Sequence, residues 1–461
     1  MEKTKISRRE FMASSGLLAG TAILGNLPFE KVSANDFIEE ATAKKMRVAL
    51  VGTGIRGITM WGKDLVRDYP DLIEFVGLCD INEGRLNFAS QHIGADCPTF
   101  LDFDEMMRTT KPDVLIVCTI DCTHHEFIIK GMEYGADIIT EKPMTIDEQK
   151  IQAILDAEKR TGKKVRVTFN YRYSPHRAKM WELLRNGEIG ELTSVDFHWY
   201  LNTSHGADYF RRWHRKIENS GSLLLHKACH HFDLLNWWID SDPETVYCVG
   251  ALEHYGKNGK FRGENCRMCS HKSECNYYWD ITKDSFLTKL YVDNYKYDKY
   301  NRDGCVFAND VNIYDKMAAT IKYKNGVQVS YSLTSYSPYE GYRIAFNGTE
   351  GRIDAWIEES NRMSDRDYDE IILFKNFGKR QYFHIPFGTS GHGGGDALLK
   401  DQIFKPNVPD PMKQCANVRD GSLACLIGIA ARKSIQTGKP VNIEGLTSIV
   451  PKRKNSITES D

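Results

Sequence analysis

Short apolar runs alternate with amphipathic segments in the part of the chain that follows residue 45. Four runs are short, apolar and rich in β-branched residues, which predicts buried strands: 46–51, 75–80, 114–118 and 137–140. The segments between and around them carry helical periodicity and predict helices: 58–68, 83–93, 103–109 and 127–134. This alternation of strand and helix is typical of a parallel, doubly wound sheet.

The pattern changes after a further helix at 146–161 and a strand at 165–170. Apolar and polar positions then alternate with a period of two in four segments: 193–201, 318–323, 327–334 and 342–347. Helical segments become fewer, with a last one at 417–438. This part predicts an α+β domain built on an open, mostly antiparallel sheet.

The fold class expected is therefore an α/β N-terminal Rossmann domain followed by a C-terminal α+β domain. A chain of 461 residues is also too long for one ordinary core. The expected divisions are a linker at 35–45, the Rossmann domain at 46–165, a substrate-binding domain at 166–445 with an insertion at about 255–310, and a tail at 446–461.

Charge and composition restrict the class of partner. The chain has 61 basic and 62 acidic residues, a formal net charge of -1, and 41% hydrophobic residues. This is a globular composition without a global field that would attract nucleic acid or a membrane surface. A small-molecule substrate suits it better.

The first residues predict an export signal rather than part of the fold. Arg8 and Arg9 precede Phe11, and a modest apolar run at 13–25 and small residues at 32–34 follow. This order resembles a twin-arginine signal peptide covering 1–34, so we expect an exported, periplasmic or secreted protein. A frayed basic N-terminus is the alternative. The apolar run is shorter than the ~20 residues that a membrane span needs, and no other run approaches that length.

A glycine-rich turn follows the first predicted strand and opens the first predicted helix. Gly52, Gly54 and Gly57 have the spacing of a dinucleotide-binding turn, in which Ile55 and Arg56 also lie against the phosphates. The helix N-terminus offers free N–H groups and a positive dipole end to those phosphates. Asp80 ends the next strand, where a carboxylate binds the adenosine ribose and disfavours a 2′-phosphate, so NAD is expected rather than NADP.

Further motifs resemble the Gfo/Idh/MocA family of oxidoreductases over about residues 46–440. They are Glu141-Lys142-Pro143 after the fourth strand, the Thr119-to-His124 loop with Ile120 in place of a proline, the segment Asn170 to Tyr173, and Gly348-Thr349-Glu350-Gly351. The resemblance implies that the cofactor site includes Thr119, His124, Glu141, Asn170 and Arg172.

The resemblance also implies the catalytic groups. Lys142 would lie near the nicotinamide, where a lysine can hydrogen-bond a substrate hydroxyl or carbonyl and stabilise alkoxide charge. His230 aligns with the family's histidine and is the expected general acid or base beside Lys142. His226 stands where many relatives have aspartate. The candidate substrate contacts on the same segment are His226, Lys227, His231 and Asp233.

Other candidates for a sugar-binding cleft are aromatic or polar. They are Arg172, Tyr173, His176, Trp199, His205 and Trp213, with His392 in a glycine-rich loop at one edge. Each of them could instead belong to the core or to a plain turn.

One group of cysteines has informative spacing. Cys266, Cys269 and Cys275, with Cys305 or His271 as a fourth ligand, could hold a structural zinc ion. Disulfide pairing in an oxidising compartment and free thiols are the alternatives.

The hypothesis that follows is an NAD(P)-dependent oxidoreductase acting on a sugar or sugar derivative with a tightly bound cofactor. Export would separate the enzyme from the cytoplasmic pool of dinucleotide, so we expect the cofactor to be loaded first. The alternatives are an NAD-dependent glycoside hydrolase or lyase that uses transient oxidation and elimination, and a non-catalytic dinucleotide or sugar sensor. Glu141-Lys142-Pro143 favours the dehydrogenase over the hydrolase branch, which tends to carry Glu-Val-Pro. The resemblance further implies a homo-oligomer formed through the C-terminal sheet.

Overall fold

The computed structural model describes residues 44–388 and 391–453. The twin-arginine segment at 1–34, most of the linker at 35–45 and the last residues of the tail lie outside the described residues. No helix in the described part is long and apolar enough to cross a membrane.

A six-stranded parallel sheet forms the N-terminal half, in the order β3-β2-β1-β4-β5-β6. Its strands are β1 Met46–Val51, β2 Ile73–Cys79, β3 Thr99–Phe100, β4 Val114–Val117, β5 Asp137–Thr140 and β6 Val165–Val167. The order reverses at β1, which pairs with β2 on one side and with β4 on the other. Ligands of doubly wound folds bind at the carboxyl ends of strands at such a reversal.

Helices lie between these strands, as the sequence predicts. They are η1 Gly57–Lys63, which is a π-helix, α2 Asp64–Asp68, α3 Glu83–Ile93, α4 Phe103–Thr110, η2 Asp121–Thr123, α5 His124–Glu133 and α6 Glu148–Thr161. Asn82, Asp102 and Asp147 cap α3, α4 and α6, because each side chain accepts a hydrogen bond from a backbone N–H of the first turn.

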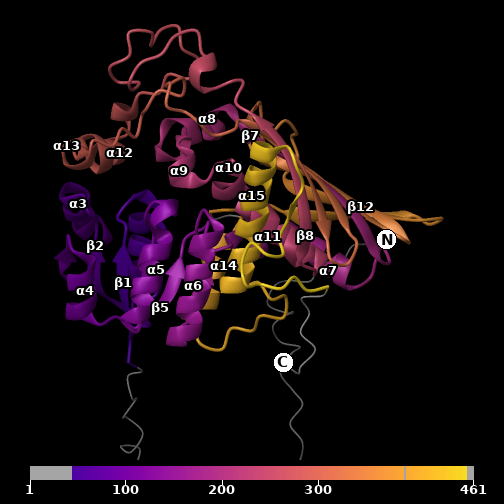
Figure 1. Ribbon diagram of the computed structural model, residues 1–461, viewed down its shortest axis with the longest axis horizontal. Helices are drawn as coiled ribbons and strands as arrows, with labels where there is room; N and C mark the ends of the chain where they lie inside the picture. The colour runs from indigo at the N-terminus through magenta and orange to yellow at the C-terminus, as the bar shows by residue number, and fades with distance from the viewer. Residues whose placement is uncertain (1–43, 389–390, 454–461) are drawn as a thin grey trace, which may run out of the picture. The chain divides into compact units, whose positions relative to one another are not determined.

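The C-terminal half contains a nine-stranded sheet in the order β14-β13-β12-β11-β7-β10-β9-β8-β15. Its strands are β7 Leu192–Asn202, β8 Pro243–Ala251, β9 Lys316–Tyr323, β10 Gln328–Ser337, β11 Glu340–Gly348, β12 Gly351–Ser360, β13 Tyr368–Lys375, β14 Arg380–Pro386 and β15 Val441–Asn442. All neighbours are antiparallel except β7 and β10. The expected fold class, a Rossmann domain followed by an α+β domain with a mostly antiparallel sheet, is confirmed (Figure 1).

The helices of this half cluster on the sheet and around its ends. They are η3 Asn170–Tyr173, α7 Pro175–Arg185, α8 Thr203–Arg211, η4 Trp213–Arg215, α9 Ile217–Ser220, α10 Leu223–His226, α11 Ala228–Ile239, α14 Gly395–Phe404 and α15 Val418–Thr437. Residues 252–315, between β8 and β9, contain only short turns: η5 Gly256–Asn258, η6 Ile281–Lys283, α12 Ser285–Leu287, η7 Thr288–Val292 and α13 Tyr295–Asp298. We call residues 276–312 of this segment the insertion arm.

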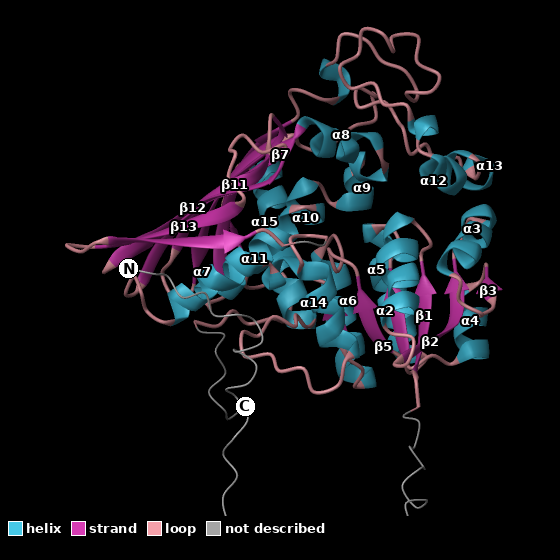
Figure 2. Ribbon diagram, turned by 180° about the vertical axis from the view of Figure 1, so that it is seen from behind, coloured by secondary structure: helices cyan, strands magenta, loops and turns pink. Residues whose placement is uncertain are grey.

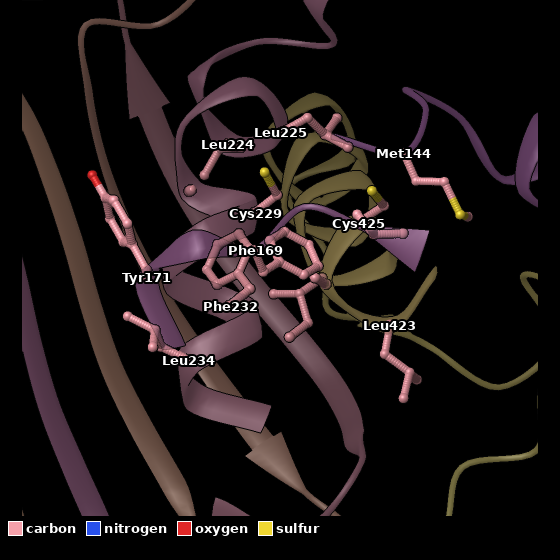
Figure 3. Packing of buried hydrophobic residues seen from close by; sticks show 14 of the residues in the cluster. Met144, Phe169, Tyr171, Leu224, Leu225, Cys229, Phe232, Leu234, Leu423 and Cys425 are labelled. Carbon is pink, nitrogen blue, oxygen red and sulfur yellow. The ribbon is translucent and has the colours of Figure 1, made fainter. Parts of the chain in front are cut away.

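Every residue of α11 is buried, and α15 packs against α11 and β8. Figure 3 shows this core, in which Phe169 and Phe232 lie between the two helices, with Cys425 on the α15 side.

A second hydrophobic cluster lies on the other face of the parallel sheet. It combines residues of η1, α2 and α3 with residues far away in sequence: Ile281, Leu287, Leu290, Tyr291, Leu399 and Phe404. The insertion arm and α14 therefore complete the core of the N-terminal half (Figure 2).

Candidate active site

The glycine-rich turn between β1 and η1 has the close packing that its sequence predicts. A Cβ on Gly52, whose φ is +95°, would lie 2.6 Å from the Cys118 carbonyl carbon, and a Cβ on Gly57 would lie 2.2 Å from the Gly52 carbonyl oxygen. At Gly54 a Cβ would meet only the Tyr291 hydroxyl, at 3.7 Å. Gly52 and Gly57 thus close the turn, whereas Gly54 leaves an open approach for a phosphate group. The residues present fit a dinucleotide.

Asp80 lies at the end of β2 beside this turn. Its Oδ2 accepts hydrogen bonds from the Thr53 backbone N–H at 2.7 Å and the Thr53 hydroxyl at 2.9 Å. Its Oδ1 accepts from the Asn82 N–H at 2.8 Å and lies 3.3 Å from an Arg85 nitrogen. Arg85 also forms an ion pair of 2.6 Å with Asp298 of the insertion arm. Two carboxylates therefore share one guanidinium at the expected ribose end of the site.

The insertion arm closes over the turn. The Ile55 backbone N–H donates to the Tyr291 hydroxyl at 3.0 Å, and the Asn82 side-chain amide donates to the Asn294 carbonyl oxygen at 3.1 Å. In Figure 1 α12 and α13 lie next to α3. Periodicity gave no signal for this contact, because the arm has no long regular element.

Glu141 is held beneath the turn. Its Oε1 accepts from Arg56 Nε at 2.7 Å and from Trp61 Nε1 at 2.8 Å, and Arg56 also pairs with Asp396 at 3.3 Å. Burial raises the pKa of Glu141, but Arg56 and Lys142 outweigh burial and leave the pKa lowered. Glu141 is therefore a buried anion that anchors the turn.

Lys142 follows at the carboxyl end of β5. Its Nζ donates to the His226 carbonyl oxygen at 3.1 Å. Burial lowers its pKa, although Cys229, Glu141 and Asp121 act in the opposite direction. A lysine ammonium has three N–H donors, so two remain for other acceptors.

Asp121 and His226 form a buried pair beside Lys142. Asp121 Oδ2 lies 2.6 Å from His226 Nδ1. Burial raises the pKa of Asp121 well above its usual value and lowers the pKa of His226 well below its usual value. Both directions favour a neutral carboxyl–imidazole pair that holds one proton between its members. The sequence interpretation missed Asp121, although it lies inside the Thr119-to-His124 loop.

Aromatic rings enclose this pair. The Trp213 and His214 rings stack at 3.7 Å between centroids, and the His226 ring centroid lies 4.0 Å from that of His214. Of the predicted substrate contacts, His226 and Trp213 are therefore brought together.

His230 lies one turn further along. Its ring stacks on Tyr171 at 4.1 Å between centroids, and the Tyr171 hydroxyl accepts from Lys227 Nζ at 2.8 Å. Burial, with Lys142 and Lys227 nearby, lowers the pKa of His230 well below its usual value. The neutral imidazole of His230 is therefore favoured, and its buried Nδ1 has no hydrogen-bond partner among the described residues.

A pocket of about 950 Å³ opens beside Tyr171. His176, His205, Glu340 and His392 line it, so three of the histidines singled out in the sequence face one cavity. His176 pairs with Asp369 at 2.9 Å and His205 pairs with Glu340 at 2.8 Å. Lys142 and His230 are not among the lining residues.

Two family models match the chain. Residues 46–169 match the NAD-binding Rossmann fold of an oxidoreductase family, and residues 181–443 match the C-terminal alpha/beta domain of that family. The chain belongs to the Gfo/Idh/MocA family of oxidoreductases.

Several known proteins resemble the chain over nearly their whole length. YteT of Bacillus subtilis (strain 168), named as an oxidoreductase, is 35% identical over 87% of this chain and 98% of its own. Glycosyl hydrolase family 109 protein 2 of Akkermansia muciniphila is 23% identical over 96% of both chains. The solved structure of a levoglucosan dehydrogenase in complex with NADH and levoglucosan has a TM-score of 0.64 at 18% identity, covering 87% of this chain and all of the other. At this identity, the similarity to the levoglucosan dehydrogenase structure shows a shared fold only.

Membership in the family supports a nicotinamide cofactor at the glycine-rich turn. The structure does not place every predicted residue at such a site. Arg172 and Asp233 form a buried ion pair of 2.6 Å, and Asp233 is 0% exposed, so Asp233 does not reach a substrate. This corrects the expectation that Asp233 contacts substrate, whereas the expectation that Arg172 belongs to the cofactor site stays a prediction.

The expectation that His231 and Trp199 face the substrate is also corrected. Both are 0% exposed, and their rings stack at 3.9 Å between centroids. His231 Nδ1 bonds to the Tyr331 hydroxyl at 2.8 Å. They belong to the core because the sheet position of Trp199 faces α11 and not the cleft. Tyr173 is likewise buried, in the cluster that includes Leu399.

His124 and Asn170 hold loops together. The two ring nitrogens of His124 lie 2.8 Å from the Pro143 carbonyl oxygen and 3.1 Å from that of Thr119. Asn170 donates to Asp396 at 2.5 Å. Both therefore fix segments around the predicted cofactor site.

The four cysteines line one small pocket. Cys266, Cys269, Cys275 and Cys305 face it together, and all are free thiols. Nevertheless, among residues 44–388 and 391–453 no group of three or more His, Cys, Asp or Glu side chains is arranged to hold a metal ion. The zinc hypothesis thus gains no support.

Proposed function

We propose that the protein is an NAD-dependent oxidoreductase that acts on a sugar or sugar derivative and holds its cofactor tightly. The observation that carries the proposal is the position of Lys142. Its amino group and the neutral Asp121–His226 pair lie together at the carboxyl ends of β4 and β5, next to a glycine-rich turn that fits a dinucleotide.

The chemistry assigned to these groups is movement of a proton. A bound nicotinamide supplies the hydride acceptor. As a neutral amine, which a lowered pKa favours, Lys142 accepts a hydrogen bond from the substrate hydroxyl and takes its proton. The Asp121–His226 pair lies beside Lys142 and can pass a proton onward through its 2.6 Å contact. His230, neutral and close to Lys142, is the further acid or base that we assign to the reaction.

The carbohydrate assignment rests on the cleft and on relatives. A related fold binds levoglucosan with NADH by its title. The 950 Å³ pocket is lined by polar and aromatic side chains, which suits hydroxyl groups and the apolar faces of sugar rings. Lys142 and His230 do not line it, but Tyr171 does, and the Tyr171 ring stacks on His230, so the pocket lies next to the assigned catalytic groups.

The choice of NAD over NADP rests on Asp80 and Asp298. Arg85 is the guanidinium that could receive a 2′-phosphate, but both carboxylates already neutralise it. A third negative group at this position would be repelled.

Substitution of Lys142 tests the proposal. We expect Lys142→Ala to lower turnover by about 10²–10⁴-fold, because the proton acceptor is lost, while the dinucleotide stays bound. Lys164→Ala, which changes an exposed lysine after α6, is the control and should leave turnover unchanged. Unchanged turnover in Lys142→Ala would refute the catalytic assignment.

Product analysis distinguishes the hydrolase alternative. Incubation of the NAD-loaded protein with a sugar substrate should reduce the bound cofactor to NADH and release an oxidised sugar. Cleavage of a chromogenic glycoside without net formation of NADH would instead support the chemistry named for the Akkermansia relative.

A further inference from the structure

One wall of the 950 Å³ pocket, which we call the arginine wall, contains Arg211, Arg302, Trp279 and Asp208. This wall carries more positive than negative charge. Arg211 and Arg302 line this wall and are 7% and 9% exposed. Their guanidinium carbons lie 5.9 Å and 5.2 Å from the ring centroid of Trp279, which also lines the pocket. Two buried cations therefore share one indole ring, which attracts both but neutralises neither.

One carboxylate, that of Asp208, forms ion pairs with arginines at this wall. Asp208 pairs with Arg302 and also with Arg212, at 3.2 Å. Burial raises the pKa of Asp208, but the two arginines outweigh it and hold the pKa at about 2, so Asp208 is an anion. Among the described residues, Arg211 bonds only to the Tyr277 carbonyl oxygen and, at 3.1 Å, to Cys266 Sγ. Two guanidiniums thus share one carboxylate, and the third has no carboxylate partner in this part of the chain.

Unused donors point to a missing anion. A guanidinium has five N–H donors, and the two partners of Arg211 account for two of them. Among the described residues, the only hydrogen-bond partner of the Arg302 guanidinium is Asp208, which accepts from one of its five N–H donors. Leaving a buried charged donor unsatisfied is costly, and a carboxylate is the planar acceptor that fits a guanidinium best.

The other acids that line the pocket cannot supply that anion, because each already has a partner. Glu340 pairs with His205, Glu359 with Arg177 and Asp369 with His176, and Glu358 accepts hydrogen bonds from the Met363 N–H and the Ser364 hydroxyl. A further anion there would meet like charge. The cavity volume lies at the upper end of the ~300–1,000 Å³ range of small-molecule sites, so a ligand could extend from Tyr171 to the arginine wall.

We propose that Arg211 and Arg302 form an anion subsite, which binds a carboxylate carried by the carbohydrate substrate. This rests on the proposed function and narrows its substrate class to acidic sugars, such as uronic acids or oligosaccharides that contain them. Trp279 holds the two guanidiniums in place, and the aromatic side of the pocket accepts the sugar ring.

Binding of two probes tests the subsite. D-glucuronate and D-glucose differ by a carboxylate in place of a hydroxymethyl group, and calorimetry on the NAD-loaded protein measures the affinity of each. We expect D-glucuronate to bind at least about tenfold more tightly than D-glucose, and added NaCl to weaken only the binding of D-glucuronate.

Three variants locate the effect. Arg302→Gln and Arg211→Gln should each weaken D-glucuronate binding by about tenfold or more without changing D-glucose binding. Arg211→Gln leaves no carboxylate unpaired, so it keeps the test valid if Arg302→Gln does not fold. Arg343→Gln is the matched control, because Arg343 also covers an indole ring, that of Trp356 at 4.5 Å, and does not line the pocket.

Equal affinity for both probes, no binding of D-glucuronate, or unchanged binding in both arginine variants would overturn the subsite. These results would leave the oxidoreductase proposal intact if a neutral sugar still reduces NAD. Conversely, arginine-dependent binding of D-glucuronate without reduction of NAD by any sugar would keep the subsite and refute the proposed function.

Discussion

Gly54 and Gly57 lie three residues apart in one turn, yet they meet different surroundings. A Cβ at Gly57 would collide with a backbone carbonyl at 2.2 Å, which cannot move without displacing β1 from η1. A Cβ at Gly54 would lie 3.7 Å from the Tyr291 hydroxyl, an ordinary contact. One glycine is therefore required by the fold and the other by the ligand.

Alanine substitutions separate these two requirements. We expect Gly57→Ala to lower the free energy of unfolding by about 1–3 kcal/mol or more. Gly54→Ala should keep wild-type stability but weaken dinucleotide binding, because the methyl group projects where the phosphates approach. Chemical denaturation and NADH fluorescence titration measure the two effects. Loss of stability in Gly54→Ala, with NADH affinity unchanged, would contradict this division.

The pH dependence of turnover reports on Lys142. Burial lowers its pKa below the 10.5 of an ordinary lysine. A base must be unprotonated to accept a proton, so sugar oxidation should rise with pH and reach a plateau with a midpoint below 10.5. The midpoint should be absent from the residual activity of Lys142→Ala. A profile that stays flat throughout the neutral and alkaline range would argue against Lys142 as the base.

At the scale of elements, the insertion arm is the main departure from expectation. The sequence suggested only an excursion, but the arm contributes Tyr291 to the glycine-rich turn and Asp298 to Arg85. Its short turns are packed by apolar side chains such as Leu290 into the second hydrophobic cluster. The arm thus forms part of the predicted cofactor site.

Asp298 is expected to enforce the preference for NAD. Asp298→Asn removes one of the two carboxylates beside Arg85, which leaves more positive charge for a 2′-phosphate. The ratio of the affinity for NADP to that for NAD, measured on protein freed of its bound cofactor, should rise on the order of tenfold. Asp293→Asn, which changes an exposed acid on the same arm, is the control. An unaltered ratio would show that Asp80 alone sets the preference.

The sequence predicted those elements whose pattern is local. All four strands first expected in the parallel sheet are present, since buried parallel strands read as continuous apolar runs. Strands β3, β8, β12, β13, β14 and β15 were not identified. Two of them, β3 and β15, have only two residues each, and β14 is largely exposed, which weakens its alternation. The Asp121–His226 pair joins positions 105 residues apart, so no spacing rule could reveal it. Trp199 and Asp233 were misplaced because sequence does not state which face of an element is buried.

For the molecule as a whole, we propose export by the twin-arginine route with the cofactor already bound. The paired arginines Arg8 and Arg9 lie outside the described residues, so the proposal rests on sequence. Its structural support is the insertion arm, which covers the turn through Tyr291 and Asn294 and would slow the release of a bound dinucleotide. A retained cofactor suits a compartment without free NAD.

Export and retention are tested together. Replacement of Arg8 and Arg9 by lysines should leave the protein in the cytoplasm of the producing cell, as measured by fractionation. Native mass spectrometry of the exported protein should show one dinucleotide per chain. Tyr291→Ala should release NADH faster than wild type in a competition experiment with excess NAD. Exported protein that carries no dinucleotide would contradict retention.

The second hydrophobic cluster has a consequence for synthesis. It joins residues of β1 and η1 to Leu399 and Phe404, about 350 positions later in the chain. A ribosome releases the nucleotide-binding half long before it has made α14, so that half emerges with part of its core exposed. Its final packing must wait for the C-terminal part of the chain. A nascent chain halted before residue 395 should therefore be more sensitive to protease in η1 and α2 than the finished protein.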